Sequence, residues 1–124
     1  MAVFLGVVLG CLAAGTRVSA EEAGQPLYKP LPLIVVNLSG GRGNHYLRCE
    51  LTLECDQPEV VTEIDRRLPQ IKDTLLMLLS GLSYEEALSP EGKRRIRAKV
   101  LEDINALLTS GRVSNTYFLD YVAQ

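Results

Sequence analysis

The sequence predicts an α+β domain in which helices cover one face of a β-sheet. Two runs with strand character, residues 33–38 and 46–55, flank a glycine-rich loop and predict a β-hairpin. The middle of the chain repeats its apolar residues at three- and four-residue steps, which is typical of amphipathic helices. A third strand-like run, residues 113–122, follows. The predicted domain, residues 33–124, is therefore a β-hairpin, a helical middle and a returning C-terminal strand.

The first 20 residues predict an export signal or a membrane anchor. Their apolar run covers only residues 2–14, whereas a spanning helix needs about 20 apolar residues. Three alternatives stay open. Cleavage after Ala20, where the preceding residues resemble a signal-peptide site, releases a soluble domain; an uncleaved segment anchors it; and Cys11, in a loose lipobox, is a lipidation site. All three place the domain outside the cytoplasm.

Residues 21–32 predict a linker rather than a packed element. This stretch is polar and contains Gly24, Pro26, Pro30 and Pro32. The folded domain is therefore expected to begin at residue 33.

The predicted hairpin contains two of the three cysteines, Cys49 and Cys55. In a strand their Cα atoms would lie about 20 Å apart at ~3.3 Å per residue, whereas a disulfide needs roughly 4.4–6.8 Å. Both cysteines share the strand parity of Leu51 and Leu53. We therefore expect two buried free thiols.

The helical middle is expected to start with Asp56 as a cap and Pro58 near the first helical position. Pro69 interrupts the apolar stripe, because proline removes a helical hydrogen bond and clashes with the preceding turn. The pattern therefore predicts a kink or two consecutive helices, over residues 58–68 and 69–80.

Two serines mark the helix starts that follow. Ser83 has capping-box spacing and predicts one short turn. Ser89, with Pro90 behind it, predicts the cap of a longer helix that Gly111 is placed to stop.

No group of residues in the sequence points to catalysis, a cofactor or a metal. The net charge is −2 and His45 is the only histidine, which excludes a multi-histidine metal site within one chain. We expect His45 to lie in a surface loop. Acidic residues such as Glu63 are expected on solvated helix faces, not beside a nucleophile or base. The sequence therefore predicts a protein that is not an enzyme.

One charged segment is a candidate contact surface. Five cations occur within seven residues of the longest predicted helix: Lys93, Arg94, Arg95, Arg97 and Lys99. A solvated helix face, a contact with a protein or lipid surface, and nucleic-acid binding are the alternatives. Export of the domain argues against nucleic acid, so a protein contact is the functional hypothesis.

Several segments together resemble the FliL family of flagellar basal-body-associated proteins. The resemblance covers the chain from about Tyr28 to its last residue. No single segment is diagnostic, but five occur in the family's order: residues 33–38, 46–53, 68–80, 88–93 and 113–124.

The resemblance implies an inner-membrane protein whose stomatin-like domain lies in the periplasm, associates with flagellar stator units, forms homo-oligomeric rings and supports motility. It brings no catalytic or cofactor-binding residues. Family members usually begin with a basic stub and a full spanning helix, and this chain departs from them there. A soluble periplasmic form is expected if the chain is cleaved after Ala20. The alternative is an exported scaffold or binding lipoprotein unrelated to flagella.

Overall fold

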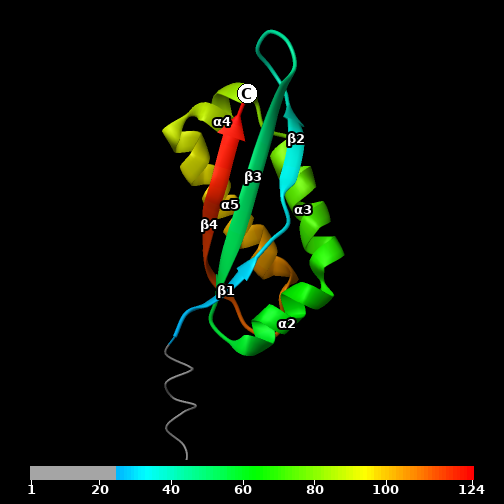
Figure 1. Cartoon of the computed structure of the whole chain (residues 1–124), viewed down its shortest axis with the longest axis vertical. Coiled ribbons are helices and arrows are strands. Elements are labelled where there is room, and N and C mark those ends of the chain that lie inside the picture. The colour runs from blue at the N-terminus through cyan, green and yellow to red at the C-terminus, as the bar shows by residue number, and fades with distance from the viewer. Residues whose placement is uncertain (1–24) are drawn as a thin grey trace, which may run out of the picture.

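Strand β3 (His45–Cys55) is the centre of a four-stranded antiparallel sheet. The computed structural model describes residues 25–124. Strands β1 (Leu27–Pro30) and β2 (Ile34–Leu38) pair with β3 along one edge, and β4 (Val113–Ala123) pairs along the other (Figure 1). The predicted hairpin and the returning C-terminal strand are both confirmed.

Within residues 25–124, four helices pack on one face of this sheet, which confirms the predicted α+β class. They are α2 (Pro58–Arg66), α3 (Leu68–Ser80), α4 (Tyr84–Leu88) and α5 (Pro90–Leu107). Alternate residues of β3 point toward these helices and are buried: Leu47, Cys49, Leu51, Leu53 and Cys55. The alternation of the sequence therefore sets which face of the sheet carries the core. Both of these cysteines are free thiols, as expected.

The prediction of a linker over residues 21–32 is wrong for its second half. Residues 27–30 form strand β1, and the next residue, Leu31, is buried and donates its N–H to the Leu51 carbonyl at 2.9 Å. Prolines are tolerated there because β1 lies at the edge of the sheet, where a missing N–H breaks no ladder. The predicted signal or anchor, residues 1–20, lies outside the described residues.

The break in the helical middle is confirmed, and it lies at Arg67, between α2 and α3. The expected cap is wrong. Gln57, and not Asp56, occupies the N-cap position of α2, and it makes no side-chain cap bond. The Asp56 carboxylate instead accepts from the Arg112 N–H at 3.1 Å, which ties the start of α2 to the loop before β4.

The serine caps are confirmed. Ser83 Oγ accepts from the Glu86 N–H at 3.1 Å and Ser89 Oγ from the Gly92 N–H at 2.9 Å. A Cβ on Gly92 would lie 1.9 Å from the Glu86 carbonyl oxygen, so the close α4–α5 turn requires glycine.

The end of α5 differs from the prediction. The helix stops at Leu107, and Leu108 is extended with φ −88° and ψ 144°, so Gly111 does not terminate it. The side chain of Asn105 closes this end by bonding both the N–H and the C=O of Val113, at 2.8 and 2.9 Å.

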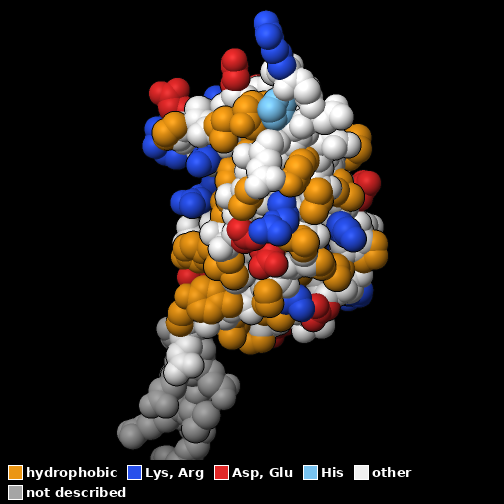
Figure 2. All heavy atoms as spheres, turned by 45° about the horizontal axis from the view of Figure 1, so that its top comes forward, with side chains coloured by type: hydrophobic (Ala, Val, Ile, Leu, Met, Phe, Trp, Pro, Cys, Tyr) orange, Lys and Arg blue, Asp and Glu red, His pale blue; other side chains and the backbone are white. Residues whose placement is uncertain are grey.

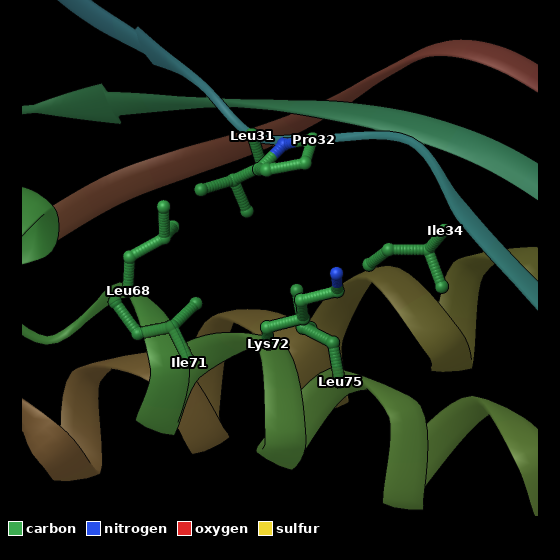
Figure 3. A pocket seen from close by; sticks show the side chains of 7 residues that line it. All are labelled: Leu31, Pro32, Ile34, Leu68, Ile71, Lys72 and Leu75. Carbon is green, nitrogen blue, oxygen red and sulfur yellow. The ribbon is translucent and has the colours of Figure 1, made fainter.

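Helix α3 packs against the connection between β1 and β2. Apolar side chains from the two segments point toward one another across a narrow notch (Figure 3). Its lining residues are Leu31, Pro32, Ile34, Leu68, Ile71, Lys72 and Leu75. The notch has no room for a water molecule, so it is part of the packing and not a ligand site.

Candidate partner-binding surface

A hollow of about 200 Å³ lies between the first half of α5 and strand β4. Its walls are three cations of α5, Lys93, Arg94 and Arg97, and two aromatic side chains of β4, Phe118 and Tyr121. In Figure 2, basic side chains gather on the side of the molecule where α4 and the start of α5 lie. The site is apolar at its floor and positively charged at its rim.

Tyr121 holds the floor of this hollow in place. Its hydroxyl donates to the Ala87 carbonyl of α4 at 2.7 Å, and its ring packs edge-on against Phe118 with 5.2 Å between centroids. Burial, followed by the nearby Cys49 thiol, raises the pKa of Tyr121 to about 12, so the hydroxyl stays a donor at neutral pH. Lys93 Nζ lies 5.2 Å from the centre of the same ring, within cation–π range.

The fold divides the five predicted contact residues. Lys93, Arg94 and Arg97 line the hollow, whereas Arg95 and Lys99 are not among its walls. Lys99 Nζ lies 3.1 Å from the Asp103 carboxylate and 3.8 Å from that of Glu102. The hydrogen bond and charge of Asp103 raise the pKa of Lys99, so this cation is already paired within its own helix.

A second hollow, of about 450 Å³, lies on the face of the sheet that the helices leave open. Tyr28, Thr52, Tyr117 and Leu119 line it. The rings of Tyr28 and Tyr117 meet edge-on, with centroids 6.4 Å apart. This surface was not predicted from the sequence, because residues 21–32 were expected to form a linker outside the folded domain.

Glu63 was expected on a solvated face, and that expectation is wrong. The residue is 2 % exposed, and its carboxylate accepts hydrogen bonds from the N–H and hydroxyl groups of Thr109 and Ser110 and from Arg67. These donors, the Ser110 hydroxyl first and the Thr109 N–H second, hold the pKa of Glu63 far below its usual range. The carboxylate therefore fastens α2 to the loop between α5 and β4.

His45 also differs from its prediction as a loop residue. It opens strand β3, is half-buried, and stacks on Tyr84 with ring centroids 3.8 Å apart. Within residues 25–124, no three His, Cys, Asp or Glu side chains are grouped to hold a metal ion. No helix in that part of the chain has the length and apolar content to cross a membrane.

The chain matches known flagellar proteins over almost all of the described fold. Residues 28–124 match the family model of the flagellar basal body-associated protein FliL. The chain is 33% identical to the flagellar protein FliL of Aquifex aeolicus (strain VF5), over 87% of this chain and 66% of that protein.

Two further relatives are more distant. The flagellar protein LafL of Vibrio parahaemolyticus is 31% identical over 49% of this chain and 37% of its own length. The flagellar protein FliL of Bacillus subtilis (strain 168) is 24% identical over 67% of this chain and 59% of its own length. The chain thus spans two thirds or less of each of these relatives. On the match of residues 28–124, the chain belongs to the FliL family of flagellar basal body-associated proteins.

Proposed function

We propose that this chain is a non-enzymatic accessory protein of the flagellar motor that supports motility by contacting stator or basal-body proteins. Family membership supports a flagellar role over the alternative of an unrelated exported lipoprotein. The surface proposed for the contact is the hollow between α5 and β4. We call Lys93, Arg94 and Arg97, together with Phe118 and Tyr121, the basic hollow.

One observation carries the proposal. Arg94 and Arg97 are exposed and make no ion pair or side-chain hydrogen bond with any residue of the described part of the chain. Unpaired cations beside an apolar floor attract an acidic partner from a distance and then bury apolar area when it docks. A helix face that only meets water or a lipid surface would not require the aromatic rings of Phe118 and Tyr121 beside the cations.

The test is a matched pair of charge-reversal variants assayed for swimming in soft agar. Changing Lys93, Arg94 and Arg97 to glutamate should leave the fold intact, because all three side chains are exposed, and should strongly reduce motility. The control changes Arg95 and Lys99 to glutamate on the same helix and should swim nearly normally. Equal swimming by both variants, at equal protein levels, would remove the basic hollow from the function.

The location of the domain belongs to the same proposal. We place it in the periplasm, either attached to the inner membrane through residues 1–20 or released by cleavage after Ala20. Cell fractionation with mass spectrometry of the mature N-terminus separates these forms. A protein recovered intact in the cytoplasm would contradict both.

Assembly is the remaining part of the proposal. A homo-oligomeric ring around the stator and a stomatin-like form of the domain stay predictions of the family resemblance. Sedimentation of the full chain over a range of concentrations tests the ring: a species that remains monomeric at high concentration contradicts it.

A further inference from the structure

Strand β4 presents a free edge directly beside the basic hollow. Along this strand Tyr46 and Gln124 exchange two main-chain hydrogen bonds, of 2.8 and 2.9 Å. In an antiparallel ladder such pairs alternate, so the next bonded pair toward the middle of β4 is Arg48 with Val122. The residues on either side of Val122, Tyr121 and Ala123, therefore direct their N–H and C=O groups away from β3.

These outward groups have no main-chain partner in the described part of the chain. Among the described strands the sheet ends at β4, which pairs only with β3. Ordinary edge strands avoid pairing by being short or by carrying prolines or inward charges. Strand β4 has no proline, and its two register shifts against β3 lie at Leu119 and Ser114. Residues 120–123 therefore form a regular stretch whose edge can accept another strand.

The helix that flanks this edge decides what kind of strand fits. A residue that pairs opposite Tyr121 must place its side chain on the same face of the sheet as Tyr121. That face holds Lys93, Arg94 and Arg97. A carboxylate at this position would meet three cations, whereas a lysine would be repelled.

We propose that the basic hollow and the free edge of β4 form one groove, which binds an extended acidic segment of a partner protein by β-strand addition. Main-chain bonds to Tyr121 and Ala123 give the segment its alignment, and the α5 cations select an acid opposite Tyr121. The inference rests on the proposed function, because it names the chemistry of the partner at the same site.

The position of the groove argues for a protein partner over a lipid headgroup. The described chain begins beside β1, whose Leu27 pairs with Cys55, whereas Tyr121 pairs with Cys49. Six residues of β3 separate these positions, about 20 Å at ~3.3 Å per residue. The groove therefore lies well along the sheet from the N-terminal end of the described residues (Figure 1).

The direct test measures binding of a blocked heptapeptide, Thr-Val-Thr-Glu-Thr-Val-Thr, to the full 124-residue chain. Binding is monitored by NMR amide spectra and by amide hydrogen exchange. Binding should shift the amides of Tyr121 and Ala123 and slow their exchange. Two control peptides carry lysine in place of the glutamate, or an N-methyl group on the glutamate nitrogen. Each control should bind at least about tenfold more weakly than the glutamate peptide. The lysine peptide loses the charge pairing, and the N-methyl peptide loses a main-chain hydrogen bond.

Four results would overturn the inference. The lysine peptide binding as tightly as the glutamate peptide removes the charge selection, and the N-methyl peptide binding equally removes the strand pairing. Slowed exchange at Tyr121 and Ala123 that grows with protein concentration, without peptide, assigns the edge to a second copy of the chain. If anionic vesicles shift the NMR signals of Arg94 and Arg97 and the peptide does not, the hollow binds lipid.

A motility variant separates this inference from the proposed function. Ala123→Pro removes an N–H that faces the open edge and leaves the ladder to β3 intact, so the fold should survive. We expect its motility to fall as in the triple charge reversal. Normal swimming of Ala123→Pro beside a non-motile triple reversal would refute strand addition and leave the basic contact standing. Normal swimming of both would refute the proposed function itself.

Discussion

The carboxylate of Glu63 and the guanidinium groups of Arg94 and Arg97 are charges on the same small domain with opposite surroundings. Glu63 is buried and saturated by donors from Thr109, Ser110 and Arg67. The two arginines are exposed, with no ion partner in the described residues. A buried charge must be satisfied within the fold, because leaving it unpaired is strongly destabilising. An exposed, unpaired charge is free to meet another molecule.

This difference predicts that the two regions respond to mutation in opposite ways. Changes at Glu63 should act on stability and reach motility only through the amount of folded protein. Changes at the three cations of the basic hollow should act on motility and leave stability almost unaltered.

Glu63→Gln should lower the Tm more than any other variant named here. The amide keeps the size of the side chain but turns an NH₂ group toward donors of Thr109, Ser110 and Arg67, where donors face donors. Thermal unfolding followed by circular dichroism measures the change. Glu59→Gln, one turn earlier and exposed, is the control and should unfold as the parent does. A parent-like Tm for Glu63→Gln would show that the buried carboxylate adds nothing to the fold.

The contribution of Glu63 should also depend on pH. Its folded pKa lies below its unfolded value of about 4.3, so its stabilisation is complete above that unfolded value and is lost as the pH falls toward the folded one. The Tm difference between the parent and Glu63→Gln should therefore be largest at neutral pH and shrink steadily below about pH 4. A difference that grows on acidification would reverse the assigned sign.

Tyr121→Phe tests the floor of the basic hollow. It removes the hydroxyl that donates to the Ala87 carbonyl and keeps the ring beneath Lys93. We expect a loss of about 1 kcal/mol in the free energy of unfolding, with motility retained because the charges and the aromatic surface remain. Urea unfolding measures the loss. A motility defect at parental stability would instead give the hydroxyl a direct part in the contact.

The smallest effect is expected for Arg95→Glu combined with Lys99→Glu. Both residues are exposed, and the ion pairs of Lys99 to Asp103 and Glu102 are of the surface kind that contributes little. The variant should nevertheless lose slightly in Tm, since it sets new acids beside existing ones. Its swimming should match the parent, and a loss as severe as that of the triple reversal would show that overall helix charge, and not the hollow, is recognised.

Much of the fold was predictable because its signals are local. Alternation in residues 46–55 set the buried face of β3, and the serines at positions 83 and 89 capped the helices that follow them. The break near Pro69 was also predictable, because proline in a helix interior kinks or breaks the helix through its own backbone. Signals of this kind act within a few residues and do not need a tertiary partner.

The errors occurred where partners are distant in sequence. Strand β1 has four residues, ends on Pro30 and is flanked by Pro26 and Pro32, and only pairing with β3 makes it a strand. Glu63 resembled a solvated helix residue, yet its donors lie 46 and 47 residues further along the chain. No local pattern distinguishes a carboxylate that will meet such a loop from one that will face water.

By itself, then, the sequence determined the class of the domain, the order of its elements, its free buried thiols and a cluster of five cations on one helix. Only the tertiary structure decided which of those cations are available. The side of α5 that packs beside β4 places Lys93, Arg94 and Arg97 around two aromatic rings, while Lys99 turns to the acids of its own helix. The physical reason is that helical spacing distributes neighbouring residues around the axis, so the strand against which the helix packs selects the cations that form a site.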